Sequence, residues 1–336
     1  MAFSFFGGVH PKENKWYACD KETQVFPEPD IVVIPMSQHI GAPCNPLVKK
    51  GDPVTVGQKI GDNQGLCVPV HASVSGTVKA VEMRAHTSGT TVMSVVIEND
   101  HLDTLCEDIK PRTQEEVDAL SPEELIGIIR EGGIVGMGGA TFPTQVKITP
   151  PKGKTIEKLV INGAECEPYL TADHRLMLEK PAEIIDGIHL MMLALDVKEA
   201  HVGVENNKMD AVEALRAAAK NVEGITIHDL PVRYPQGGEK QLIHAVTGRQ
   251  VPSGKLPIEV HTIVTNVATA AAIADAVIDG KPLISRITTV TGKVVNPSNL
   301  RVRIGTVVAD MIGECGGYSE EAAKIVMGGG MTGVCT

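Results

Sequence analysis

Five glycines fall within eight positions of one segment, Gly132–Gly139. Backbone N–H groups in such a run are not covered by side chains, so the run can approach a phosphate or a flat ring closely. Lys147, further along, has the charge to pair with a phosphate. The run is neither a Walker A loop, because no Gly-Lys-Ser/Thr follows, nor a standard dinucleotide-binding turn, because a predicted helix precedes it. A purely structural loop with tight turns is the alternative interpretation.

A second group of polar side chains follows a short buried strand predicted at Leu159–Ile161. The next residues read Asn-Gly-Ala-Glu-Cys-Glu-Pro. Ligands of open α/β sheets bind at the carboxyl ends of strands, where Asn162 can bond a heterocycle edge and Glu165 and Glu167 can accept from ribose hydroxyls or a carboxamide. The alternative is that these carboxylates lie solvated in a loop. For Cys166 we favour a packed thiol over a nucleophile, because no histidine is placed by sequence to activate it.

Two more turns of the same kind occur later in the chain. Tyr234–Gln241 reads YPQGGEKQ and leads into a predicted helix, and Val264–Thr269 reads VTNVAT between a strand and a helix. Gly-Gly-Glu at a helix N-terminus suits an anion or a hydroxyl. Each turn is a weak signal alone. In a parallel sheet, however, such turns converge on one edge, so four of them indicate a ligand site.

The elements that must position these turns alternate between helix and strand. Ser121 is a suitable N-cap, and Pro122 a suitable first residue, for a helix through Arg130. Further on, we predict strands at Leu159–Ile161, Glu199–Val204 and Gly224–His228, and helices at Pro181–Leu195, Lys208–Lys220, Gly238–Thr247 and Ala268–Asp279. This alternation predicts a Rossmann-like parallel sheet with helices on its faces.

Short strands between glycine and proline turns fill the N-terminal part of the chain. The sequence pattern of Val48–Val54 and Ala72–Val78 resembles that of biotinyl and lipoyl domains, which have the barrel-sandwich hybrid fold. Those domains carry a modified lysine at a hairpin tip, but the corresponding stretch here, Asp62–Cys67, has none. Near the C-terminus, two predicted strands around an Asn-Pro-Ser-Asn turn, followed by a short helix at Thr306–Cys315, indicate a small β-grasp-like module.

The predicted protein is therefore a multi-domain α/β chain. We expect an N-terminal arm at 1–26, an all-β barrel-sandwich hybrid at 27–100, the Rossmann-like domain at 101–285 and the β-grasp module at 286–336.

Composition excludes several classes of function. A net charge of −10 and an aromatic content of 3% argue against a nucleic-acid binder. The seven cysteines contain no CxxC pair and the histidines are scattered, so we expect neither disulfides nor a metal site held by this chain. No apolar stretch is long enough to span a membrane, and no signal peptide is evident. We therefore expect a cytoplasmic protein that can dock on a membrane complex through a partner.

Taken together, the motifs resemble a known family. Gly136–Lys147, Asn162–Pro168, Tyr234–Leu242 and Thr265–Thr269 resemble the loops of the flavin-bearing 51 kDa subunit of respiratory complex I. The segment Val290–Gly317 resembles the soluble-ligand-binding β-grasp (SLBB) module that follows in that family. The opening Phe5–Lys15, FFGGVHPKENK, and the barrel-sandwich unit point to one branch, the C subunits of the bacterial Rnf complex, an ion-translocating ferredoxin:NAD oxidoreductase.

The resemblance implies non-covalent FMN and NAD(H) as cofactors, with hydride transfer between them and no catalytic side chain. It implies that FMN is bound by Gly136, Gly138, Gly139, Ala140, Lys147, Asn162, Glu165, Tyr234, Gly237, Gly238, Asn266 and Thr269. It implies that NADH is bound by Phe142, Glu167 and Glu239. It also implies that Asp173 and Arg175 support the residues that contact the ligands. The chain departs from the family pattern at Met137, which replaces an Arg, at Ala164, which replaces an Asp, and at Gly238 and Ala268, which each replace a Glu.

The family continues into two CxxCxxCxxxCP motifs that hold [4Fe-4S] clusters. The present sequence stops before them, at Cys335-Thr336, so we expect a chain truncated ahead of its iron–sulfur domain. The implied partners are the cluster-bearing B subunit, the membrane subunits and, indirectly, ferredoxin, with the chain peripheral on the cytoplasmic side of the cell membrane. Two alternatives stay open on the sequence: a related FMN-dependent cobalamin reductase of microcompartments, and a non-catalytic assembly scaffold.

Overall fold

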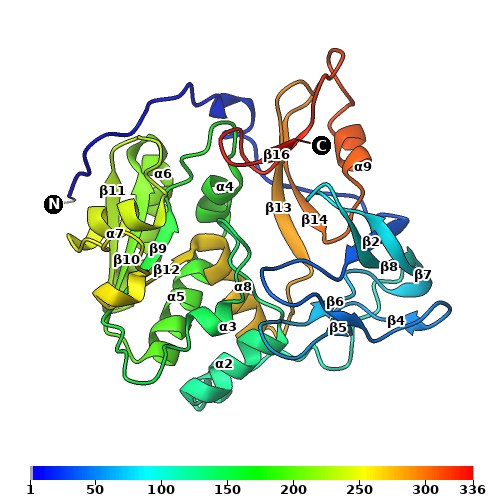
Figure 1. Cartoon of the computed structure of the whole chain (residues 1–336), viewed down its shortest axis with the longest axis horizontal. Coiled ribbons are helices and arrows are strands. Elements are labelled where there is room, and N and C mark those ends of the chain that lie inside the picture. The colour runs from blue at the N-terminus through cyan, green and yellow to red at the C-terminus, as the bar shows by residue number, and fades with distance from the viewer. Residues whose placement is uncertain (1–2, 336) are drawn as a thin grey trace.

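A four-stranded parallel sheet lies on the left in Figure 1, which shows the computed structural model; the model describes residues 3–335. Residues 1, 2 and 336, which the domain predictions include, lie outside the described residues. The strand order is β11-β10-β9-β12, and every pair is parallel. The strands are β9 (Lys158–Gly163), β10 (Glu199–Glu205), β11 (Ile225–Leu230) and β12 (Thr262–Asn266). The predicted parallel sheet is confirmed.

Helices cover both faces of this sheet because its strands are apolar on both sides. On one face, Leu159 and Ile161 of β9 belong to a large core that includes buried residues of α2, α4, α5, α6 and α8. On the other face, Val160 packs with Leu242 and Ile243 of α7. The α-helices of this domain are α1 (Gln114–Asp118), α2 (Pro122–Glu131), α3 (Thr144–Lys147), α4 (Ala172–Glu179), α5 (Pro181–Leu195), α6 (Met209–Ala218), α7 (Glu239–Thr247) and α8 (Val267–Val277).

Three of these helices, α1, α3 and α4, are not among the sequence predictions, and α3 is a single turn of four residues whose N-cap, Pro143, makes no side-chain capping bond. Helix α1 lies in the acidic connector, where Thr113 and Glu116 form a capping box that stabilises five helical residues. Helix α4 begins after Thr171, whose side chain makes no capping bond, so no sequence signal marks its start. For α2 the predicted start is correct, because Ser121 and Glu124 form a capping box with Pro122 in the first turn.

The N-terminal β domain consists of two small sheets around their own core. One sheet has the order β2-β8-β7-β4 and the other β3-β5-β6. Val32, Ile60 and Ile97 are fully buried between them. The strands are β2 (Ile31–Pro35), β3 (Asn45–Pro46), β4 (Pro53–Val54), β5 (Lys59–Asp62), β6 (Val70–His71), β7 (Gly76–Ala85) and β8 (Thr91–Asn99).

The C-terminal module pairs β13 (Ser285–Val290) with β14 (Ser298–Arg303) in antiparallel fashion, with α9 (Val308–Glu314) packed nearby. The N-terminal segment crosses the molecule to reach it, as the blue trace in Figure 1 shows. It forms a 3₁₀ turn, η1 (Lys15–Tyr17), and then β1 (Gln24–Val25), which pairs in parallel with β14. The segment predicted as an arm therefore contributes a strand to the β-grasp sheet.

The last described residues form a short hairpin of β15 (Val326–Met327) and β16 (Val334–Cys335). The remaining short turns are η2 (Asn206–Lys208), η3 (Ala219–Asn221) and η4 (Pro257–Val260). None of the helices within residues 3–335 has the length and apolar character needed to cross a membrane.

Candidate functional site

The glycine-rich loop packs against the start of α8 at the carboxyl edge of the sheet. Its two arms pair through the Gly136 N–H, which donates to Phe142 O at 2.9 Å. The Met137 N–H donates to Thr269 Oγ1 at 3.0 Å. A Cβ on Gly138 would lie 2.6 Å from Asn266 Nδ2, so only glycine allows this approach. The residues at the tip of the loop, 139 and 140, are exposed.

Asn162 ties the turn after β9 to the turn before α7. Its Nδ2 donates to Gly237 O at 2.9 Å, and its Oδ1 accepts from the Ala164 N–H at 3.0 Å. A Cβ on Gly237 would overlap Ala164 O, so the two turns pack backbone to backbone. The Gly237 N–H also donates to Cys166 Sγ at 3.3 Å. Cys166 is thus a half-buried thiol held in a turn, and burial raises its pKa.

Asn266 connects the same edge to α4. Its Nδ2 donates to Asp173 Oδ2 at 2.7 Å and to Asn162 O at 3.2 Å. Its Oδ1 caps α8 by accepting from the Ala268 N–H at 2.8 Å. The fold therefore brings residues of three separate sequence motifs to one edge of the sheet: Asn162, Gly237, and the pair Asn266 and Thr269.

Two carboxyl groups lie close together inside this network. The Asp173 N–H donates to Glu165 Oε1 at 2.8 Å. Burial, reinforced by the Glu165 charge, raises the pKa of Asp173 to about 6. The Glu165 side chain is 7% exposed, and its Oε2 has no hydrogen-bond partner within residues 3–335.

Lys15 supplies a cation to this pair. Its Nζ lies 3.9 Å from Glu165 Oε2 and donates to Glu167 O at 2.9 Å and Leu170 O at 2.5 Å. Burial lowers the pKa of Lys15, and the Glu165 charge opposes that shift. Lys15 thus braces the loop that carries Glu165 and Glu167. No sequence signal gives Lys15 this role, although it ends the opening motif, because the contact joins positions far apart in the chain.

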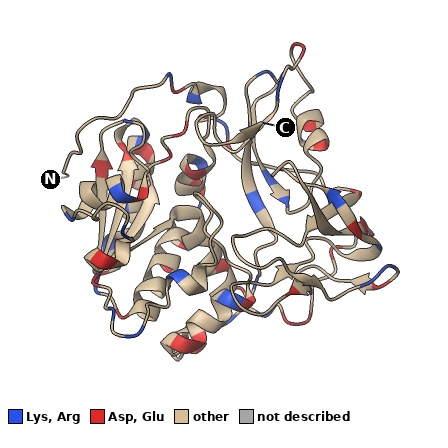
Figure 2. Ribbon diagram, in the orientation of Figure 1, with Lys and Arg blue, Asp and Glu red and all other residues tan. Residues whose placement is uncertain are grey.

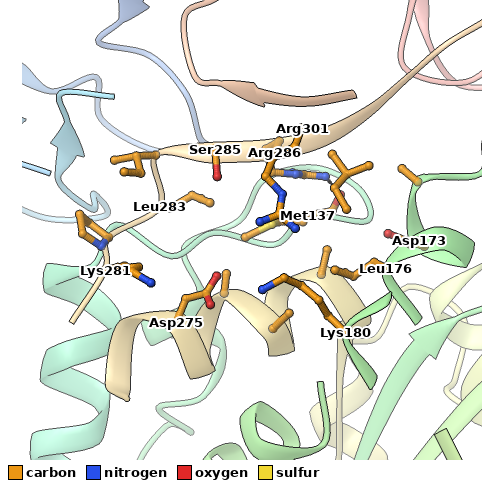
Figure 3. Close-up of a pocket in the computed structure, with 17 residues that line it drawn as sticks. Met137, Asp173, Leu176, Lys180, Asp275, Lys281, Leu283, Ser285, Arg286 and Arg301 are labelled. Atoms are coloured by element: carbon orange, nitrogen blue, oxygen red, sulfur yellow. Dashed lines mark hydrogen bonds between the residues drawn. The ribbon is translucent and has the colours of Figure 1, made fainter. Parts of the chain in front are cut away.

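Arg286 of β13 is a second site residue that the sequence motifs do not include. Its guanidinium donates to Met137 O at 3.2 Å. Burial lowers the pKa of Arg286, and Asp173 opposes that shift. Basic positions lie on the neighbouring strands β13 and β14 in Figure 2. Figure 3 shows Arg286 and Arg301 side by side above a cavity of about 90 Å³, with Lys180 and Asp275 on its opposite side.

Four further predicted residues, Lys147, Glu167, Tyr234 and Glu239, form the more exposed part of the site, which we call its outer side. Lys147 Nζ is 3.0 Å from Glu239 Oε1, and both side chains are about a third or more exposed. The two oxygens of the Glu167 carboxylate accept from the Met331 N–H at 2.9 Å and from Thr332 Oγ1 at 2.6 Å. The β15–β16 hairpin therefore covers this carboxylate. From the sequence alone, both a solvated and a ligand-binding carboxylate are possible at this position. Tyr234 pairs through its backbone with Val9 of the N-terminal segment.

The arrangement fits a flat, anionic ligand such as FMN. The backbone of Gly138–Ala140 suits a ring or a phosphate. The orphaned Glu165 Oε2 is a buried acceptor that a ligand donor would satisfy. Positive charge comes from Lys147, from Arg286 and from the N-terminus of α8.

Three family models match successive parts of the chain. The fold and the turns at its sheet edge define a flavoprotein-type domain, and the Nuo51 FMN-binding domain model matches residues 129–275. The RnfC barrel sandwich hybrid domain model matches residues 3–102, and the SLBB domain model matches residues 287–334.

Relatives that align with nearly the whole chain identify its family more closely. The C subunit of the Na(+)-translocating ferredoxin:NAD(+) oxidoreductase complex of Acetobacterium woodii is 49% identical, across 98% of this chain and 75% of its own. The proton-translocating counterpart of Clostridium ljungdahlii is 47% identical, across 99% of this chain and 73% of its own. The chain belongs to the family of C subunits of ion-translocating ferredoxin:NAD(+) oxidoreductases. These relatives do not favour the cobalamin reductase alternative.

Solved structures support the same fold. An NAD+-reducing [NiFe]-hydrogenase in its air-oxidized state has a TM-score of 0.55 and 22% identity, over 64% of this chain and 43% of that chain. At this identity the likeness concerns the fold alone.

Proposed function

We propose that this chain transfers electrons between NAD(H) and a non-covalent FMN as the C subunit of an ion-translocating ferredoxin:NAD(+) oxidoreductase. The observation that carries the proposal is the convergence of four turns at the carboxyl edge of one parallel sheet, within the region matched by the FMN-binding model. Asn162 and Asn266 join these turns by hydrogen bonds, so the edge is a connected surface rather than a set of loose loops.

The residues that would hold FMN are those of the buried network and the glycine loop. Gly138–Ala140 would offer backbone N–H groups, while Gly136 holds the loop closed through its bond to Phe142 O. Asn162, Glu165 and Asn266 would offer polar side-chain atoms. FMN held by these residues would supply the chemistry, which is hydride acceptance from NADH and release of single electrons. The chain's own part is to orient the partners and exclude water at the buried end of the site, as at Asp173 and Glu165.

Arg286 would compensate for a departure from the family pattern. The resemblance places an Arg where this chain has Met137, so one cation is missing from the loop. The Arg286 guanidinium lies against the Met137 carbonyl and returns a positive charge to that position from β13. We therefore assign Arg286 to the phosphate end of the FMN site.

NAD(H) would bind on the outer side of the loop, at Phe142, Glu167 and Glu239. The Glu167 carboxylate is held by Met331 and Thr332, so the β15–β16 hairpin must give up these two bonds before a ribose can take them. The Lys147–Glu239 pair is partly exposed and can exchange partners at modest cost.

The finer parts of the proposal concern the whole complex. Electrons would pass to the two [4Fe-4S] clusters that the resemblance implies, and from there to the cluster-bearing B subunit and the membrane subunits. The chain would lie on the cytoplasmic side of the membrane. We keep the four-part division at 1–26, 27–100, 101–285 and 286–336 as a proposal.

The test is an absorbance measurement on the purified chain. The protein is incubated with FMN, desalted and mixed with NADH without oxygen. Retained absorbance near ~450 nm that NADH bleaches supports the proposal. Retained flavin that NADH does not bleach contradicts the NAD(H) site. Failure to retain flavin contradicts the FMN site and favours the scaffold alternative.

A further inference from the structure

Three potential metal ligands meet in the core of the N-terminal β domain. His39 and Cys44 lie in the loop between β2 and β3, and Cys67 lies between β5 and β6. Cys44 Sγ is 3.4 Å from Cys67 Sγ, and Cys67 Sγ is 3.6 Å from His39 Nε2. Their ligand atoms all lie within 4.8 Å of one another. The residues are 9%, 4% and 0% exposed for His39, Cys44 and Cys67, so the cluster is enclosed.

The histidine is oriented to present a lone pair to the two thiols. With its proton on Nδ1, His39 donates to Ile40 O at 3.2 Å. This leaves Nε2 as an acceptor, facing Cys67 Sγ and the Val68 N–H at 3.4 Å. Metal-binding histidines commonly have this second contact, because it fixes both the tautomer and the ring.

The thiols have only weak partners of their own. Both sulfurs lie near Val68 O, at 3.3 Å for Cys44 and 3.5 Å for Cys67. Burial and the neighbouring Cys67 raise the pKa of Cys44. The two thiols and the imidazole thus lie within reach of a single ion in the core of the β domain.

We propose that His39, Cys44 and Cys67 bind a zinc ion, with a water molecule as the fourth ligand. Around one tetrahedral Zn²⁺, with Zn–S near 2.3 Å and Zn–N near 2.0–2.1 Å, ligand atoms lie about 3.5–3.8 Å apart. The observed 3.4 and 3.6 Å separations approach this spacing. Binding releases one proton from each thiol to solvent and involves no oxidation. Two thiolates, a neutral imidazole and Zn²⁺ carry no net charge, so the buried site holds no uncompensated charge.

The zinc would stabilise the part of the β domain that touches the glycine loop. The Ile40 N–H, next to His39, donates to Thr141 O at 3.3 Å. The ion would join the His39–Cys44 loop to the turn at Cys67. It would therefore also fix the position of Ile40, which donates to Thr141 O. This role is structural and does not depend on the proposed electron transfer.

The test is metal binding by the reduced chain. The protein, kept under a thiol-free reductant, is incubated with Zn²⁺, dialysed and analysed for metal by mass spectrometry. We expect one zinc per chain. Co²⁺ in its place should give the thiolate charge-transfer absorption and the strong visible bands of a tetrahedral site. Cys44→Ser, Cys67→Ser and His39→Gln should each lower zinc affinity tenfold or more, while the control Cys106→Ser should keep one equivalent.

Several results would overturn the proposal. The wild-type measurement comes first, because it does not depend on how well the variants fold: no zinc retained by reduced wild-type protein refutes the site directly. Equal zinc in Cys44→Ser, with an unchanged circular dichroism spectrum, shows adventitious binding elsewhere. A Cys44–Cys67 disulfide found in mildly oxidised protein that binds no zinc when reduced shows a redox pair instead.

Discussion

The two ends of the candidate site differ in burial, and this difference indicates which end holds a cofactor and which end exchanges a substrate. At the inner end, Asn266, Asp173 and Glu165 form a buried network braced by Lys15 and Arg286. At the outer end, Lys147 and Glu239 form a partly exposed pair, with side chains 35% and 40% exposed. Removing one partner of a buried polar group lowers the free energy of unfolding strongly, whereas an exposed ion pair contributes little to it. The inner end is therefore suited to a resident cofactor and the outer end to a substrate that comes and goes.

The largest effect should come from Gly237→Ala. The new Cβ would overlap Ala164 O, so the turns that Asn162 joins must move apart. We expect a loss of about 1–3 kcal/mol in the free energy of unfolding and the loss of FMN retention. Denaturant unfolding and desalting with FMN measure the two effects. The control is Gly127→Ala on α2, where a Cβ meets no atom within 4 Å, and the variant should not lose stability. Equal stability of Gly237→Ala and wild type would contradict the packing of these turns.

The next effect is a pH dependence carried by Asp173. Its pKa is raised on folding, from 3.8 to about 6, so between these values the folded state binds more protons than the unfolded state. Stability therefore falls as pH rises through this range, by on the order of 1–3 kcal/mol for this group. Asp173→Asn removes the titrating group. Unfolding at a series of pH values should show wild type losing stability relative to Asp173→Asn between about pH 4 and pH 6. Parallel curves would show that Asp173 is not the buried acid described above.

Removal of the inner cation should weaken FMN binding without unfolding the chain. Arg286→Ala deletes the guanidinium at Met137 O, and we expect roughly tenfold weaker FMN binding, as for the loss of one charge-assisted hydrogen bond. Fluorescence quenching of FMN measures the affinity. Arg301→Ala is the matched control, because Arg301 lines the same cavity from β14, and it should bind FMN like wild type. If both variants bind alike, Arg286 has no specific part in the site.

The smallest effect should come from the hairpin at the outer end. Thr332→Val deletes the hydroxyl that donates to Glu167 Oε1, so less binding energy is needed to free that carboxylate. We expect NADH to bind about two- to fivefold more tightly, in line with the net value of one exposed hydrogen bond. The control is Thr226→Val on the exposed side of β11, which should leave NADH affinity unchanged. Weaker NADH binding by Thr332→Val would mean that the hairpin helps to bind NADH.

The parts of the site that follow strands directly could be predicted from the sequence. Asn162 and Asn266 each lie at the end of a strand of one parallel sheet, so their convergence follows from the alternation of elements alone. Arg286 and Lys15 could not be placed in this way, because their contacts join the sheet domain to β13 and to the N-terminal segment. The cluster of His39, Cys44 and Cys67 could not be predicted from the sequence either. Their irregular spacing matches no metal motif, and only the packing of the two loops brings them together.

The central claim is that FMN is held at the buried end of this sheet edge, and a crystal structure of the FMN-loaded chain tests it most directly. The account predicts flavin density along Gly136–Ala140, with the phosphate toward Arg286 and the N-terminus of α8 and a ligand donor on Glu165 Oε2. Flavin density elsewhere, with the Asn266–Asp173 bond and the Glu165 oxygen unchanged from the present structure, would contradict it.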